Sequence, residues 1–160
     1  MLGAFRSLCR AAIRIADPVH VKLYAVGRMR GPGWQVLADD YLERIRHYVR
    51  CDIVEFKNDA ELLRHLPKDD LIVALEVKGS SISSQSLAQK LESWGSKGKG
   101  RIGFIIGGTD GIPPQCSSQA HYQLSLSSLT LPHRLARVIM LEQIYRAMTI
   151  LKAEPYARES

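Results

Sequence analysis

The stretch RIGFIIGGTDGIPP, residues 101–114, joins a short apolar segment to a loop rich in glycine. Phe104–Ile106 is typical of a strand buried on both faces, and two glycines follow it directly. Many folds use a strand that runs into a glycine loop to bring backbone close to a ligand. The loop matches neither G-x-G-x-x-G nor G-K-[ST], and Pro113-Pro114 does not suit a helix that opens on it as in dinucleotide-binding proteins. The pattern alone leaves a tight turn and a ligand site as alternatives.

Strands and helices alternate on both sides of this stretch. We expect strands at 21–27, 51–56, 71–77, 102–106 and 122–126, and helices at 32–49, 59–66, 83–94 and 132–152. The alternation predicts the α/β class, with a mostly parallel sheet and helices on both faces. Ligands of such sheets bind beyond the carboxyl ends of the strands, where LEVKG, IIGGTDG and LSLSSLTLPH place loops.

Composition indicates one soluble domain with a basic surface. The 160 residues are 46% apolar and 24% charged, and no apolar run approaches the length of a membrane span. The formal charge is +6, of which residues 21–160 supply +4, and this weakly favours a polyanionic partner. Three cysteines without a CxxC pair, and histidines without an H-x-x-x-H pair, predict no disulfide framework and no metal site. A reducing compartment fits this cysteine usage.

The first twenty residues differ from the rest. They carry arginines at 6, 10 and 14 and a single acid, which is the composition of an organelle transit peptide. The alternative, which we prefer, is a dispensable extension ahead of a strand that begins at Val21. We therefore expect 1–20 to lie outside the core, 21–160 to form the domain, and the protein to be cytoplasmic, or organellar if the extension is a transit peptide.

The last expected helix has an unusually wide apolar face, which covers an arc of about 200°. A helix packed on one side of a small domain needs a narrower stripe. Either other elements of the chain enclose this helix, or part of its face, with Met140, Ile144 and Leu151, meets a second copy. We prefer the second alternative. Arg137 falls inside the apolar arc and needs a partner there, so it is a candidate site residue.

The segments FIIGGTDGI (104–112) and LSLSSLTLPHRLARVIMLEQIYRAMTILKAEPY (124–156) resemble the RlmH family of the SPOUT methyltransferases. That family methylates ring nitrogen 3 of a pseudouridine in large-subunit ribosomal RNA with S-adenosylmethionine. The resemblance covers about residues 21–156. It implies a C-terminal trefoil knot that holds the cofactor, a homodimer whose interface forms the active site, and ribosomal RNA or the assembled ribosome as partner, without a metal or a membrane.

The resemblance also implies the site residues. Glycine at 107 suits a cofactor that approaches the backbone, and loop leucines suit adenine. Arg134 and Arg137 are expected to hold RNA phosphate or to stabilise negative charge on the base, and Tyr156 and Arg158 are the expected catalytic residues. The expected cofactor-binding residues are Leu75, Gly107, Leu126, Ser127, Ser128, Leu129, Thr130 and Leu131.

One departure from the family concerns the tail, where Ala157 stands in place of the usual imidazole. It leaves open a non-catalytic RNA- or ribosome-binding protein with the same fold. A nucleotide-binding α/β protein of other function is a third alternative, based on GGTDG alone.

Overall fold

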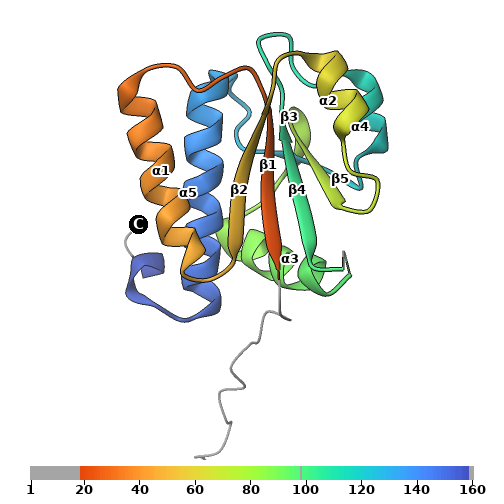
Figure 1. Cartoon of the computed structure of the whole chain (residues 1–160). Helices are drawn as coiled ribbons and strands as arrows, with labels where there is room; N and C mark the ends of the chain where they lie inside the picture. Colours follow the sequence, from red (N-terminus) through yellow and green to blue (C-terminus); the bar gives the residue numbers. More distant parts are fainter. Residues whose placement is uncertain (1–18, 98, 159–160) are drawn as a thin grey trace, which may run out of the picture.

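A computed structural model describes residues 19–97 and 99–158, which fold around one parallel sheet (Figure 1). The sheet order is β2-β1-β4-β3-β5, and every pairing between neighbouring strands is parallel. This confirms the predicted α/β class. The strands are β1 (His20–Val26), β2 (Arg50–Phe56), β3 (Leu71–Ser81), β4 (Arg101–Ile106) and β5 (Tyr122–Ser125). The helices are α1 (Pro32–Arg46), α2 (Asp59–His65), α3 (Ser84–Lys97), α4 (Pro114–Gln119) and α5 (His133–Leu151), followed by the 3-10 helix η1 (Pro155–Arg158).

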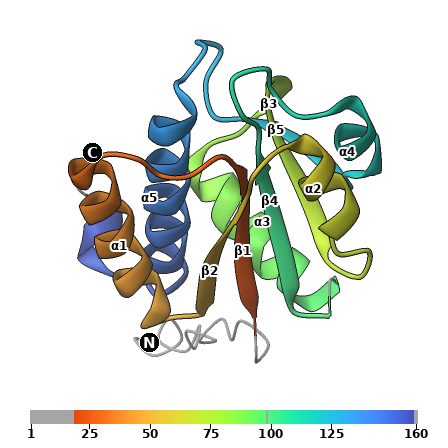
Figure 2. The same cartoon turned by 45° about the horizontal axis from the view of Figure 1, so that its top comes forward.

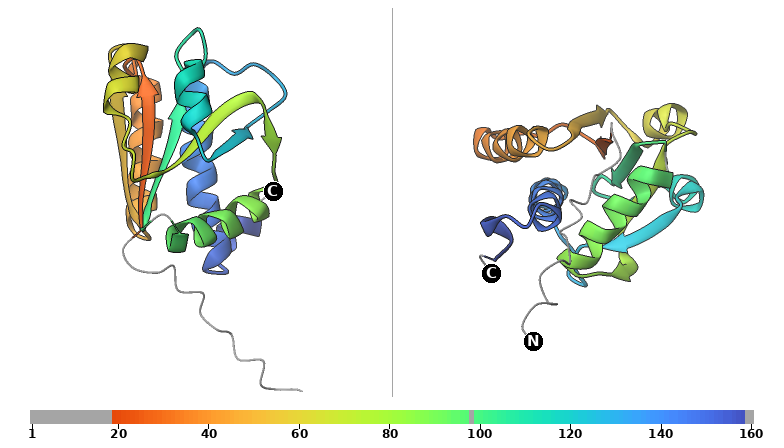
Figure 3. Two further views of the ribbon diagram at one scale, coloured as in Figure 1. Left: turned by 90° about the vertical axis from the view of Figure 1, so that its right-hand side faces the viewer. Right: turned by 90° about the horizontal axis from the view of Figure 1, so that it is seen from below.

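Helices cover both faces of the sheet, as the alternation predicts. Alternate residues of one strand point to opposite faces, so in β4 Phe104 packs on one side and Ile105 on the other. The larger core lies under α1, α3 and α5, and the smaller one lies under α2 and α4. Seen from below in Figure 3, these two groups of helices lie on opposite sides of the sheet. The stretch that opens the sequence is therefore a central strand between β1 and β3.

Helix α5 is enclosed by its own chain. It packs against α1 on one side and α3 on the other, and Met140 and Ile144 are 1% and 0% exposed. The wide apolar arc therefore does not require a second copy, and the prediction that Met140 and Ile144 contact one is wrong. The width of an apolar stripe shows how much of a helix is buried, not what buries it. Here the sheet, α1 and α3 bury α5.

Three elements differ from expectation. Strand β3 continues to Ser81, although its second half, VKGSS, looks like a loop. Helix α4 begins at Pro114, because proline is tolerated in the first helical turn, where its missing N–H would have no partner anyway. Helix α1 ends at Arg46, three residues early, and Leu37, which helical periodicity places on its apolar side, is 46% exposed.

The domain begins two residues earlier than predicted. Val19 is buried in the larger core, and His20 opens β1, where its Nε2 lies 2.7 Å from Oδ2 of Asp52. Residues 1–18, on which most of the extension falls, lie outside the described part of the chain.

The trefoil knot that the resemblance implies stays a prediction. Within residues 19–97 and 99–158, no helix combines the length and the apolar character needed to cross a bilayer.

Candidate functional site

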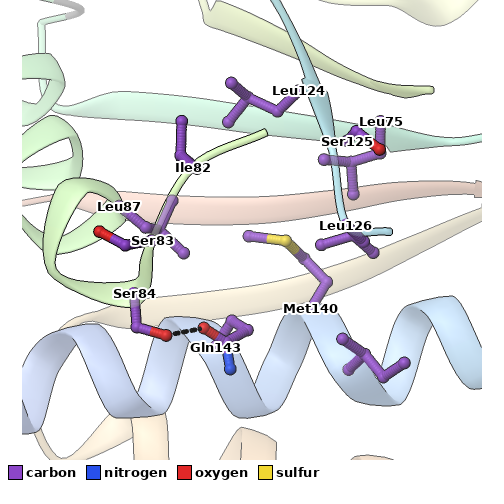
Figure 4. Close-up of a pocket in the computed structure, with 11 residues that line it drawn as sticks. Leu75, Ile82, Ser83, Ser84, Leu87, Leu124, Ser125, Leu126, Met140 and Gln143 are labelled. Carbon is purple, nitrogen blue, oxygen red and sulfur yellow. Dashed lines mark hydrogen bonds between the residues drawn. The ribbon is translucent and has the colours of Figure 1, made fainter. Parts of the chain in front are cut away.

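A cavity of about 310 Å³ opens where the ends of β3 and β5 face α3 and α5. Leu75 comes from β3 and Leu126 from the segment after β5, while α5 contributes Met140 and Gln143 (Figure 4). Its walls are mainly apolar, with hydroxyl and amide groups at one side. Ser84 Oγ lies 2.6 Å from Gln143 Oε1 there and ties the start of α3 to α5. The lining residues are Leu75, Ile82, Ser83, Ser84, Leu87, Leu124, Ser125, Leu126, Ile139, Met140 and Gln143.

A smaller cavity of about 80 Å³ adjoins the first and shares Leu75 and Leu126 with it. It reaches the end of β4 at Ile106 and the loop between β5 and α5. Its lining residues are Leu75, Glu76, Val77, Ile106, Leu126, Ser127, Leu129, Leu131 and Ala136. Five of the eight predicted cofactor residues thus line one or both cavities, and Gly107, Ser128 and Thr130 line neither.

A bulge in β3, where it pairs with β5, forms one wall of these cavities. Leu124 of β5 pairs first with Leu75 and then with Ser80, so the four residues between them bulge out of the ladder. The backbone of Leu124 passes so close to Gly79 that a β-carbon on Gly79 would lie 2.5 Å from the Leu124 carbonyl carbon. Only glycine fits that contact, and the bulge carries Glu76 and Val77 to the smaller cavity.

Serines give the loop after β5 its shape. Ser125 Oγ donates to the carbonyl oxygen of Ser127 at 2.8 Å, and the Leu129 N–H donates to Ser127 Oγ at 3.0 Å. These are local turn hydrogen bonds of the kind that serine makes outside helices. They hold Leu129 outward, where it is 71% exposed, beside Val77, which is 50% exposed and lines the same cavity. The mouth of the smaller cavity is therefore apolar and open to solvent.

The structure requires glycine at position 107 for a reason other than the predicted approach of the cofactor. A β-carbon there would lie 2.3 Å from the carbonyl carbon of Gly111 and 2.6 Å from the nitrogen of Ile112. The glycine is needed because its own loop folds back on it, and Gly111 adopts a φ of 82° in that turn. The backbone of Gly107 thus faces its own loop. Of the two alternatives for this glycine loop, the geometry at Gly107 supports the tight turn.

Several lining residues were not predicted as site residues. They lie on α5, at Ile139, Met140 and Gln143, and on the segment Ile82–Leu87. The serine-rich stretch GSSISSQS (79–86), which spans the end of β3 and the start of α3, is the one sequence signal that marks this region. Periodicity placed Ile139 and Met140 on the apolar face of α5, and it cannot tell a core contact from a cavity wall.

Arg137 has the partner that its place in the apolar arc demands. Its guanidinium is 0% exposed, donates from Nη1 to Glu55 Oε1 at 2.9 Å, and donates from Nη2 to the carbonyls of Val26 and Gly27 at 3.0 and 2.8 Å. Burial lowers the pKa of this guanidinium, and Glu55 opposes part of that shift. A wholly enclosed group cannot reach an RNA phosphate, so the predicted direct contact of Arg137 with RNA is wrong.

Arg134 and His133 open α5 next to the cavity loop. Arg134 is half-buried, and its role in RNA binding stays a prediction. Burial lowers the pKa of the His133 imidazole, and the charges of Arg137 and Arg134 lower it further. His133 is therefore neutral at pH 7, and the local positive charge comes from the two arginines.

The tail packs on its own chain. Tyr156 donates from its hydroxyl to Glu142 Oε1 at 3.0 Å, and its ring centroid is 4.6 Å from that of Tyr145. The Cζ atom of Arg146 lies over the Tyr156 ring, 5.0 Å from its centroid. Burial, with hydrogen bonds to Tyr41 and Glu142, raises the pKa of the Tyr156 hydroxyl, so it stays protonated. Tyr156 lines neither cavity of its own chain, and the catalytic roles of Tyr156 and Arg158 stay predictions.

The described residues hold no group of three or more histidine, cysteine or carboxylate side chains placed to bind a metal ion. Cys51 and Cys116 are buried free thiols, and burial raises the pKa of Cys51 to about 12.

Residues 19–157 match the protein family described as "Predicted SPOUT methyltransferase". The chain belongs to the SPOUT methyltransferase family. This assignment confirms the resemblance read from the sequence, and a methyltransferase requires a site for a methyl donor. The two adjoining cavities, at the carboxyl ends of β3, β4 and β5, are where a parallel sheet places such a site.

Similar proteins include SPOUT methyltransferases named for ribosomal RNA. The chain is 46% identical over 138 residues to "Ribosomal RNA large subunit methyltransferase H" of Sorangium cellulosum (strain So ce56), covering 83% of this chain and 95% of that protein. It is 37% identical to the protein of the same name from Ruegeria sp. (strain TM1040), covering 88% and 99%. The crystal structure of TrmJ from Z. mobilis ZM4 overlaps with a TM-score of 0.46 at 11% identity, over 84% of this chain and 71% of that one.

Proposed function

We propose that the chain transfers a methyl group from S-adenosylmethionine to ring nitrogen 3 of a pseudouridine in large-subunit ribosomal RNA. The observation that carries the proposal is the pair of adjoining cavities, bounded by the segments that resemble the RlmH family. The relatives named above support ribosomal RNA of the large subunit as substrate, since their names state it. The basic charge of the chain agrees with a polyanionic partner.

The lining residues fit the proposed cofactor. Ligand pockets are typically ~300–1,000 Å³ and mainly apolar, with a few polar groups that fix orientation. The larger cavity, about 310 Å³, lies at the lower end of that range. Leu75, Leu126 and Met140 suit the faces of an adenine ring, while Ser84 and Gln143 suit polar groups of the cofactor. S-Adenosylmethionine supplies an electrophilic methyl group when bound.

The chain's own residues have two remaining tasks. They must align the target nitrogen with the methyl group, and they must favour loss of the proton from that nitrogen. We assign alignment to the loop at 125–131 and to Arg134, which lies at the start of α5 where RNA phosphate or negative charge on the base can be held. Neutral His133 adds no charge there.

We further propose that the active form is a homodimer and that the tail of one chain completes the site of its partner. Tyr156 lines neither cavity of its own chain, so we assign its catalytic contact to the site of a second copy. Its ring is half-buried beside Tyr145 and Arg146, and the part of the ring that stays exposed would offer a surface for a base to stack on.

Transfer of labelled methyl groups to ribosomal particles from a strain without the endogenous enzyme tests the proposal, with mapping of the modified nucleotide. We expect one modified pseudouridine, labelled at nitrogen 3. Leu126→Trp should fill the shared part of the two cavities and weaken binding of S-adenosylmethionine in calorimetry, while Leu37→Trp, on an exposed position of α1, should leave it unchanged. Modification of a different nucleotide would refute the assigned target.

The specific observation for a rival is Ala157, a half-buried alanine in η1 where the family has an imidazole. Cofactor binding without transfer, in both the native protein and Ala157→His, would favour a non-catalytic RNA-binding protein. If the imidazole serves the chemical step, Ala157→His should instead accelerate single-turnover transfer by about 10²–10⁴-fold with little change in cofactor affinity.

A further inference from the structure

The segment Gly27–Gly31, sequence GRMRG, joins the carboxyl end of β1 to α1 and carries two arginines. Arg28 and Arg30 are both exposed. Gly27 and Gly31 adopt φ values of 87° and 99°, so the backbone turns sharply at both ends of the segment. In Figure 2 this connection crosses over the start of α5. Two exposed cations thus lie at the same end of the sheet as the cavities, beyond the carboxyl ends of the strands.

One buried cation fixes the backbone of this segment. Arg137 donates to the carbonyls of Val26 and Gly27, where the segment leaves β1. The carboxylate of Glu55, which pairs with Arg137, also accepts the N–H of Met29 at 2.7 Å. The Gly27 carbonyl on one side of Arg28 and the Met29 N–H on the other are therefore both held by the Arg137–Glu55 ion pair. This pair joins β2 and α5 to the end of β1.

An arginine at this position is costly for the fold alone. Enclosing a guanidinium removes it from water, and a well-packed apolar side chain is often as stable or more stable in such a place. Arg137 lies one helical turn after His133, on the helix that the cavity loop enters. The network thus couples the cavity side of α5 to the arginine-bearing segment.

We propose that Arg137 is a positioning residue for RNA: it holds Gly27–Gly31 so that Arg28 and Arg30 bind RNA phosphates beside the cofactor cavity. The inference rests on the proposed function for its substrate class. Arg137 itself touches no RNA. Its contribution passes through the shape of the segment and through Glu55.

A double-mutant cycle tests this, with the native protein, Arg137→Met, the pair Arg28→Gln and Arg30→Gln, and the triple variant. The readouts are RNA affinity as a function of salt, KM for RNA, kcat, and affinity for S-adenosylmethionine. Each phosphate contact adds ~0.7 to the slope of log K against log salt for single-stranded nucleic acid, so the pair should lower the slope by about 1.4. Arg50→Gln, an exposed arginine at the opposite edge of the sheet, is the matched control.

We expect Arg137→Met to lower the slope and raise KM although it removes no exposed charge, with cofactor affinity unchanged. The triple variant should then be little worse than the pair, because the two changes act through one segment. Additive effects, or an unchanged slope in Arg137→Met, would overturn the proposal. If Arg137→Met does not fold, Glu55→Ala replaces it, since it removes the acceptor of both the Arg137 Nη1–H and the Met29 N–H; the same loss of slope is expected.

Hydrogen exchange gives a readout that does not depend on methyl transfer. Arg137→Met should speed exchange of the Met29 amide, while amides of β4 keep their protection. Unchanged exchange at Met29 would also overturn the proposal. A native protein that transfers no methyl group, yet binds RNA through Arg28 and Arg30, would refute the proposed function and leave the role of Arg137 standing.

Discussion

Gly79 and Leu124 are in direct backbone contact at the bulge where β3 pairs with β5, with no room for a side chain between them. This contact allows β3 to pair twice with the same residue of β5, and it places the bulge that walls the cavities.

Gly79→Ala should therefore lower the free energy of unfolding by about 1–3 kcal/mol, the usual cost of forcing an extra carbon into a packed site. Urea denaturation measures the change, and calorimetry should show weaker cofactor binding in the folded variant. Gly33→Ala is the matched control: its β-carbon meets nothing within 4 Å, in helix α1, so it should be neutral or stabilising by up to about 1 kcal/mol. Equal stability of the two variants would contradict the close backbone contact between Gly79 and Leu124.

Gly107→Ala should lower stability, because its β-carbon would overlap the backbone of Gly111 and Ile112. The loop must shift, so any loss of cofactor affinity should be accompanied by a lower melting temperature. Gly108→Ala is the control, since its β-carbon would lie 3.4 Å from Val26 Cγ1, an ordinary contact. A Gly107 variant of native stability that loses only cofactor binding would restore the original prediction of a direct cofactor contact.

Ile144→Asp should unfold the chain. Ile144 is 0% exposed within one chain, and an unpaired carboxylate there would be buried among apolar side chains of the larger core. The milder Ile144→Ala should cost about 2–5 kcal/mol in urea denaturation. Val36→Asp, at a position that is 66% exposed on α1, should leave stability within about 0.5 kcal/mol of native. A folded, monomeric Ile144→Asp protein in light scattering would show instead that this side chain lies at a contact between copies.

The stability of the protein should fall as the pH drops below about 6.5, the ordinary pKa of histidine. The pKa of His133 is lowered in the folded chain, so the unfolded chain binds more protons at this residue between the two values. Unfolding free energy therefore rises with pH across that interval, and the contribution is complete above it. His133→Gln should remove this part of the pH dependence of the unfolding free energy. The Asp52 carboxyl affects stability in a separate pH range, below about 3.9, the ordinary pKa of aspartate. Burial alone would raise the pKa of Asp52, but hydrogen bonds from His20 and Arg46 lower it overall. Superimposable pH profiles of native and His133→Gln proteins would contradict the assignment.

The order of the strands and of every α-helix except α4, and the parallel sheet, were readable in the chain because they depend on local spacing, and the family was readable in its motifs. Phe104–Ile106 is apolar in every residue since β4 is covered on both faces, and the motifs after it are specific in combination. The pattern also placed a loop at LSLSSLTLPH, the resemblance assigned Leu126–Leu131 to the cofactor site, and the apolar arc showed that Arg137 needs a partner.

Tertiary structure alone decided what each buried surface meets. Periodicity shows that one side of α5 is covered, but Met140 and Ile144 are covered by the same chain, and Arg137 finds its partner Glu55 82 residues away. Gly79 and Gly107 are required by backbone that arrives from elsewhere in the fold or from the following turn. Spacing along a chain reports the direction in which a side chain points, whereas contact depends on how distant elements pack, and that is a property of the whole fold.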